Sequence, residues 1–74
     1  MPHETLDCLG LSCPFPLIKI KERMGKLRPG QILEVLVDDP LAKTDVPGWC
    51  ELMGHKVLKV EEAEGILKFY IKKA

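Results

Sequence analysis

Apolar and polar residues repeat with two different periods along this 74-residue chain, and the changes of period divide it into six short segments. A two-residue alternation predicts strands over residues 3–8 and 66–72, and the branched apolar run at 32–37 predicts a buried central strand. Residues 56–60 fit a fourth strand, which a hairpin loop at 61–65 joins to the last one. In the first strand Leu6 and Cys8 share one face, whereas Thr5 and Asp7 share the other.

Two of the segments between these strands have helical spacing instead. The first helix is predicted over residues 14–27, and Arg28-Pro29-Gly30 ends it. The second is expected to start near Thr44 or Asp45 as its cap, with Pro47 in the first turn and Gly54 at its end. The two apolar stripes consist of Leu17, Ile20, Met24 and Leu27, and of Val46, Trp49, Cys50 and Met53.

The resulting order, β-α-β-α-β-β, predicts a single domain over residues 1–74. A right-handed crossover makes the first two strands parallel, and the hairpin makes the last two antiparallel. Because each helix has one apolar stripe, both are expected on one face of a four-stranded mixed sheet, in a two-layer α/β (α+β) sandwich. The other sheet face is expected to be open to solvent, with Glu34, Lys59, Lys68, Tyr70 and Lys72 on it.

Composition narrows the function classes. With 46% hydrophobic and 30% charged residues the chain suits a compact domain, and its zero formal net charge disfavours direct nucleic-acid binding. The N-terminal stretch 1–7 has no apolar signal region and no apolar run could span a membrane, so we expect a cytoplasmic protein. A basic set is interpreted as a solvated face; steering of an acidic partner or of tRNA toward Cys13 is the alternative. It comprises Lys19, Lys21, Arg23, Lys26, Arg28 and Lys43.

The three cysteines are Cys8, Cys13 and Cys50. An odd number with no secretion signal disfavours a disulfide framework, and the absence of a C-x-x-C pair disfavours a structural zinc site. We therefore expect free thiols and no metal or organic cofactor. Cys8 alternates with Leu6 and is interpreted as a core residue of its strand, or alternatively as a resolving thiol. Cys50 and Trp49 are interpreted as core residues of the second helix.

Cys13 is the candidate functional residue, because the run Cys13-Pro14-Phe15-Pro16 places it at the mouth of the first helix. Proline keeps the residue before it extended, which favours Cys13 as the N-cap, although the helix could begin a residue or two later. The helix end stabilises an anion by about 0.3–1 kcal/mol, which lowers the thiol pKa by less than about one unit. The pattern thus predicts a moderately reactive, exposed thiol.

Nothing in the sequence supplies this thiol with a catalytic base. His3 and His55 have no reason to approach Cys13, and a protease-like or acyl-transfer pair needs such a base. The two prolines also lack the N–H groups that an oxyanion hole or phosphate cradle requires. These features favour a thiol that other proteins load and unload over a self-sufficient enzyme.

The stretch from Leu6 to Pro16, LDCLGLSCPFP, resembles the signature of the TusA/SirA-like sulfur carrier family, and Pro29-Gly30, Asp38-Asp39-Pro40 and the stretch 45–50 extend the resemblance over nearly the whole chain. The resemblance implies the same sandwich and matches Cys13 to the sulfur-accepting cysteine. It further implies that Cys13 takes persulfide sulfur from a cysteine desulfurase. The sulfur would then pass to a downstream relay protein, for tRNA 2-thiouridine synthesis or other sulfur metabolism. No transfer role is implied for Cys50.

Three functions follow from these observations. The leading hypothesis is a monomeric sulfur carrier that works by thiol–persulfide exchange at Cys13. The second is a regulatory or RNA-associated binding module, which rests on fold analogy alone. The third is a thiol redox protein in which Cys8 resolves an oxidised Cys13.

Overall fold

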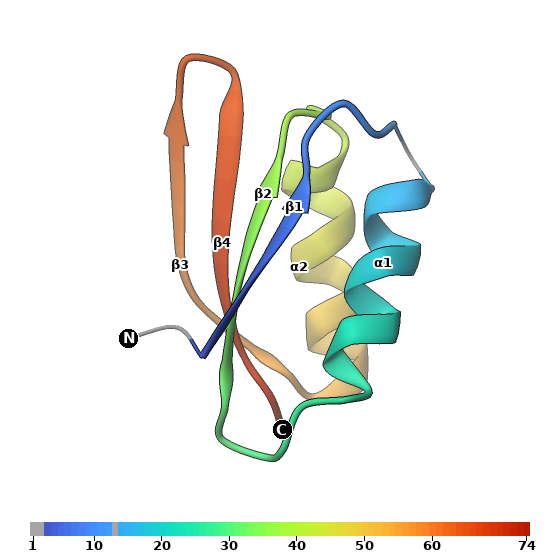
Figure 1. Ribbon diagram of the computed structural model, residues 1–74, viewed down its shortest axis with the longest axis vertical. Coiled ribbons are helices and arrows are strands. Elements are labelled where there is room, and N and C mark those ends of the chain that lie inside the picture. Colours follow the sequence, from blue (N-terminus) through green and yellow to red (C-terminus); the bar gives the residue numbers. More distant parts are fainter. Residues whose placement is uncertain (1–2, 13) are drawn as a thin grey trace.

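Six elements form the chain in the computed structural model, which describes residues 3–12 and 14–74 (Figure 1). They are β1 (Glu4–Cys8), α1 (Phe15–Met24), β2 (Ile32–Val37), α2 (Ala42–Met53), β3 (Lys56–Ala63) and β4 (Ile66–Lys72). The strands form one mixed sheet in the order β1-β2-β4-β3. β1 pairs with β2 in parallel, and β4 pairs antiparallel with both β2 and β3. The predicted α/β fold class is confirmed.

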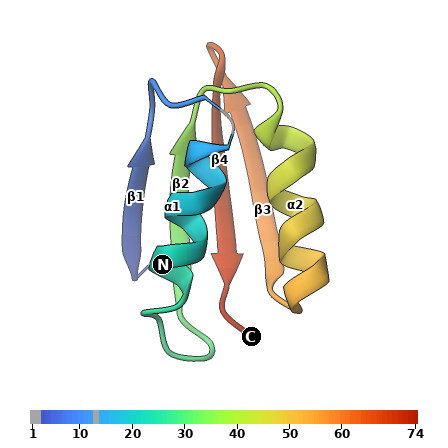
Figure 2. The same cartoon turned by 90° about the vertical axis from the view of Figure 1, so that its right-hand side faces the viewer.

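Both helices cover the same face of the sheet (Figure 2). The alternation in the strands explains this layering, because Leu33, Val35 and Val37 of β2 are fully buried while Glu34 faces the other side. The described core consists of Leu6, Cys8, Ile20, Met24, Leu27, Leu33, Val35, Val37, Ala42, Val46, Cys50, Leu67, Phe69 and Ile71. Ile20, Met24 and Leu27 are buried as predicted and Leu17 packs against them, but α1 ends at Met24, three residues before the predicted end, so Leu27 lies beyond the helix.

The second helix begins earlier than predicted. It starts at Ala42 rather than near Thr44 or Asp45, and Leu41 is its N-cap. The cause is Asp39, whose Oδ1 accepts the Leu41 N–H at 3.0 Å and whose carbonyl accepts the Ala42 N–H at 3.1 Å, so the chain turns directly after β2. Pro47 consequently lies inside the helix.

The apolar stripe of α2 also differs at its end. Ala42, Val46 and Cys50 are buried, and Trp49 packs beside them as expected. Met53 is 54% exposed, so its assignment to the core was wrong. The buried residues are spaced by four, and a stripe with that spacing turns away from Met53 in the last turn.

The β3–β4 hairpin is tighter than the predicted five-residue loop. β3 extends to Ala63, and only Glu64 and Gly65 connect it to β4. Their φ angles of 53° and 78° are both positive, as a type I′ turn requires. A register shift between Val57 and Lys59 marks a bulge near the start of β3.

Candidate functional site

The segment that carries Cys13 connects β1 to α1 and lies at the end of the molecule where β1 and β2 both terminate (Figure 1). Cys13 itself lies outside the described residues, so the site is built from its neighbours. The β2–α2 connection and the β3–β4 hairpin reach the same end, because β4 runs antiparallel to β2. Three connections therefore lie at the end of the molecule to which Ser12 and Pro14 belong.

Two aspartates fix the described part of the β1–α1 connection. Asp7 Oδ1 accepts the Leu9 N–H at 2.9 Å, and Asp38 Oδ2 accepts the Gly10 N–H at 3.0 Å. Gly10 has φ +79°, a conformation that other residues adopt only with strain. The Asp38 bond ties the β1–α1 connection to the β2–α2 connection. The sequence pattern did not predict this role of Asp38.

The first helix begins one residue later than the preferred prediction. Pro14 is the N-cap, with φ −96° and ψ 8°, so the assignment of Cys13 as N-cap is corrected in favour of the later start. Phe15 N–H donates to Ser12 O at 2.9 Å, which closes a turn before the helix, and Ile18 N–H makes a helical bond to Pro14 O at 3.1 Å. These two bonds restrain the backbone on both sides of position 13.

This helix start is poor in donors for an anion. Pro14 and Pro16 have no N–H, and the Phe15 N–H is already bonded to Ser12. At most the Leu17 amide remains free in the first turn. An oxyanion hole or phosphate cradle needs several convergent N–H groups, so the geometry disfavours both.

Exposed apolar surface flanks position 13. Ser12 and Pro14 are exposed, and Phe15 is 56% exposed. Pro16 is buried, and with Leu17 it lines a narrow hollow against the start of α2. The helix start is thus anchored on one side and presents an uncovered aromatic ring on the other.

The other two cysteines lie in the core. Cys8 is 0% and Cys50 is 1% exposed, which confirms their interpretation as core residues. Burial raises the pKa of the Cys8 thiol, although Lys19 partly opposes this effect, and burial raises the pKa of Cys50 to about 11. A buried thiol that resists ionisation is a poor nucleophile, so these facts weigh against Cys8 as a resolving thiol.

Both histidines lie far from this end. His3 precedes β1, and its Nδ1 accepts the Ile32 N–H at 3.1 Å. His55 follows α2, where its Nδ1 accepts the Ala74 N–H at 3.0 Å and its ring lies 5.3 Å from that of Trp49. Each therefore sits at the start of its strand, opposite the β1–α1 connection, and neither supplies a base there.

Most of the basic set also points away from position 13. Lys21 and Arg23 belong to the last turn of α1, and Lys26 and Arg28 follow it. Lys43 lies at the start of α2 but pairs with Glu62 at 2.9 Å. Lys19 is the exception, because it lies close enough to Cys8 to oppose the rise of that thiol's pKa. The placement of the other charges gives no support to the alternative that the set steers an acidic partner or tRNA toward Cys13.

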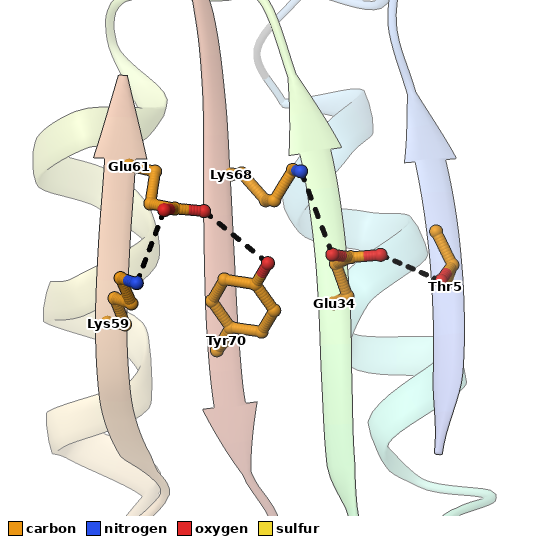
Figure 3. A network of polar contacts seen from close by, with 6 residues as sticks. All are labelled: Thr5, Glu34, Lys59, Glu61, Lys68 and Tyr70. Atoms are coloured by element: carbon orange, nitrogen blue, oxygen red, sulfur yellow. Dashed lines mark hydrogen bonds and ion pairs between the residues drawn. The ribbon is translucent and has the colours of Figure 1, made fainter. Parts of the chain in front are cut away.

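The open face of the sheet carries a polar network that the sequence only outlined (Figure 3). Glu34 accepts from Thr5 at 2.9 Å and pairs with Lys68 at 3.9 Å. Glu61 pairs with Lys59 at 3.2 Å and accepts from Tyr70 at 3.4 Å. The pKa of Tyr70 rises to about 12, chiefly through hydrogen bonding to Glu34, and the pKa of Glu34 falls, chiefly through Thr5.

Two structural properties bear on the binding of metals and on membranes. Within residues 3–12 and 14–74, no three His, Cys, Asp or Glu side chains are grouped so that they could hold a metal ion. Neither helix of that same part of the chain has the length and apolar character needed to cross a membrane.

Known proteins are similar to this chain in sequence. The family model for sulfurtransferase TusA matches residues 4–73. "Putative sulfur carrier protein YrkI" of Bacillus subtilis is 43% identical over 95% of this chain and 93% of its own length. A "Putative sulfur carrier protein" of Aquifex aeolicus is 44% identical over 95% of the chain, which spans only 36% of that relative.

A solved structure agrees with both sequence matches. The crystal structure of a SirA-like protein from Desulfitobacterium hafniense superimposes with a TM-score of 0.82 at 30% identity. The match covers 93% of this chain and 95% of the other. Sequence and fold thus lead to the same assignment, and the chain belongs to the TusA family of sulfurtransferases.

Proposed function

We propose that this chain is a sulfur carrier in which Cys13 accepts persulfide sulfur from a cysteine desulfurase and passes it to a downstream relay protein. One observation carries the proposal: in a TusA family chain, both other cysteines are sealed in the core, whereas the neighbours of Cys13 are exposed. Residues 1–74 act as one carrier domain, and the exchange takes place in the cytoplasm, where thiols stay reduced.

The chemistry is an exchange with no net oxidation. The Cys13 thiolate attacks the terminal sulfur of the donor persulfide; a new S–S bond forms, the donor S–S bond breaks, and the donor leaves as a thiolate. In the second half-reaction an acceptor thiolate attacks the outer sulfur of the Cys13 persulfide, and Cys13 leaves as the thiolate. Neither step needs a metal or an organic cofactor.

The residues around position 13 suit a thiol that carries sulfur rather than the active site of a hydrolase. The Phe15 N–H bonds to Ser12 O, and neither histidine lies at this end of the molecule to act as a base. Exposed Phe15 offers apolar contact to a docking protein. The final destination of the sulfur, such as the 2-thiouridine of tRNA, would be set by the acceptor.

The test is to incubate the protein with a cysteine desulfurase and cysteine and to record the intact mass. We expect a gain of one sulfur atom that the Cys13→Ser variant abolishes. The matched control is Cys50→Ala, which removes a core thiol and should keep the gain. A gain that survives Cys13→Ser, or none in the wild type, would reject the proposal.

The same sample tests the redox alternative. After mild peroxide, a Cys8–Cys13 disulfide would lower the mass by two hydrogens and block alkylation of both thiols. Because Cys8 is buried and its pKa is raised, we expect no such disulfide in the folded protein.

A further inference from the structure

The charges of this chain are separated toward its two ends, although its formal net charge is zero. The β1–α1 connection, the β2–α2 connection and the β3–β4 hairpin meet at one end (Figures 1 and 2). Seven of the chain's 11 acidic residues lie in or beside these connections, namely Asp7, Asp38, Asp39, Asp45, Glu61, Glu62 and Glu64. Two lysines, Lys43 and Lys68, lie among them. We call this region the acidic end.

Basic side chains gather at the opposite end. It is formed by the last turn of α1, the α1–β2 and α2–β3 connections and the C-terminal end of β4, and it contains Arg23, Lys26, Arg28, Lys56, Lys72 and Lys73. A protein with such a charge separation orients itself in the field of an approaching partner before contact. A positively charged partner therefore meets the acidic end first.

An apolar hollow lies within the acidic end, on the open face of the sheet. It is open to solvent and has a volume of about 500 Å³. Its apolar residues are Leu9, Leu36, Ala63 and Ile66, and its charged residues are Glu61, Glu62, Glu64 and Lys68. Leu9 belongs to the β1–α1 connection, so the hollow extends from the β3–β4 hairpin to that connection.

The register of the sheet explains why the hollow is apolar. The network of Figure 3 occupies the middle of the open face, where charged side chains pair with one another. Toward the hairpin, Leu36 pairs with Lys68 in the ladder and Ala63 pairs with Ile66. Lys68 is directed to Glu34, so the space beyond it is bounded by Leu36 and Ile66. Three glutamates lie on the rim, of which Glu61 also pairs with Lys59 and Glu62 with Lys43.

We propose that the acidic end is the surface on which the protein that exchanges sulfur with Cys13 docks, and that this partner inserts an apolar side chain flanked by lysine or arginine into the hollow. The inference rests on the proposed function, because the partner is the protein that exchanges sulfur with Cys13. A carboxylate rim favours cationic side chains and repels the phosphates of a nucleic acid. The apolar floor favours a side chain with little polar surface.

The test is an NMR titration of the ¹⁵N-labelled protein with a short probe, the acetylated and amidated peptide Lys-Leu-Lys-Leu-Lys. We expect the largest amide shift changes at Leu9, Leu36 and Ile66. The peptide Glu-Leu-Glu-Leu-Glu is the matched probe and should leave these amides unmoved. Raising the salt to about 0.5 M should weaken the binding several-fold, because exposed charges are then screened.

Substitutions test the glutamates of the rim and the apolar floor of the hollow separately. The triple variant Glu61→Gln, Glu62→Gln and Glu64→Gln should weaken binding of the basic peptide about tenfold. Ile66→Lys should abolish it by filling the hollow with a charge. The matched control is Leu52→Lys on α2, where the side chain is 81% exposed and outside the hollow, and it should bind as the wild type does.

Several outcomes would overturn the inference. They are equal shifts with both peptides, shifts confined to the basic end, or shifts at the hollow produced by a single-stranded RNA instead. Shifts that depend on protein concentration without peptide would assign the surface to a second copy of this chain. The peptide carries no thiol, so Cys13→Ser should bind it normally. If the protein binds the basic peptide but is not loaded with sulfur, the carrier function alone is rejected. If it is loaded with sulfur but does not bind the peptide, the docking surface alone is rejected.

Discussion

The two phenylalanines of this chain lie in two regions that are stabilised by different interactions. Phe69 of β4 is fully buried between the sheet and the helices, whereas Phe15 at the start of α1 is 56% exposed. Around Phe69, order comes from apolar packing. Around Phe15, it comes from prolines and from bonds such as those of Asp38 to Gly10 and Phe15 to Ser12. The stability of the fold and the shape of the candidate site are therefore carried by separate sets of residues.

The largest expected effect tests this separation directly. Phe69→Ala should lower the free energy of unfolding by about 3–5 kcal/mol, because it removes a large side chain from a closed core. Phe15→Ala should lower it by less than about 1 kcal/mol, since its ring is already partly in water. Urea denaturation of both variants measures the two values. Equal losses would show that the helix start belongs to the same packed unit as the core.

Phe15→Ala should act on function instead. If the uncovered ring contacts a docking protein, loading by a cysteine desulfurase should slow several-fold while the fold stays intact. Ile18→Ala is the matched control, because that residue is 50% exposed on the same helix. Slower loading in both variants would point to a general effect on α1.

The second prediction concerns Cys50, which is a buried core thiol, whereas Cys13 is the proposed reactive thiol. Burial raises the pKa of Cys50 from 9.0 to about 11, so the folded chain holds this proton more tightly than the unfolded chain does. Its contribution to stability is fully present below about pH 9 and is lost as the pH rises through 11. The loss should reach about 2–3 kcal/mol.

The measurement is the free energy of unfolding of the wild type and of Cys50→Ala between about pH 8 and about pH 11. This range covers the interval between the unfolded and the folded pKa of the Cys50 thiol. Tyr70, with its pKa raised to about 12, titrates in both proteins and cancels in the comparison. The wild type should lose more stability than the variant. Parallel curves would show that Cys50 ionises freely and that the core is open at this point.

The core and the start of α1 also differ in how much of their structure could be predicted from the sequence. Periodicity predicted the bounds of β2 and β4, the stripe of α1 and the burial of Cys8, because burial in a two-layer fold follows from spacing. It misplaced the start of α2, since a single Asp39 side chain set where the chain turns, and it misplaced Met53, because the buried stripe of α2 turns away from that residue. The bond from Asp38 to Gly10 joins residues 28 positions apart, and no local pattern contains it.

The third prediction breaks that bond. Asp38→Ala should cost about 1 kcal/mol and should raise the exchange rate of the Gly10 amide hydrogen, because the N–H loses its acceptor. Asp38→Asn keeps an oxygen and should restore most of the protection. Glu51→Ala on the exposed surface of α2 is the control for loss of a carboxylate. Unchanged exchange in Asp38→Ala would mean that the connection is held by other contacts.

The smallest expected effect concerns the hairpin of the acidic end, where backbone conformation rather than packing sets the shape. Glu64 has φ 53° in the type I′ turn, a conformation that asparagine adopts at lower cost. Glu64→Asn should therefore raise the free energy of unfolding by about 0.5 kcal/mol, and thermal denaturation at fixed pH would detect it. Gly65→Ala, at φ 78°, should lower it by about 1 kcal/mol. If Glu64→Asn stabilises the fold but weakens the basic peptide, then this glutamate is retained in a strained position for its charge, and conformation and docking compete at a single residue.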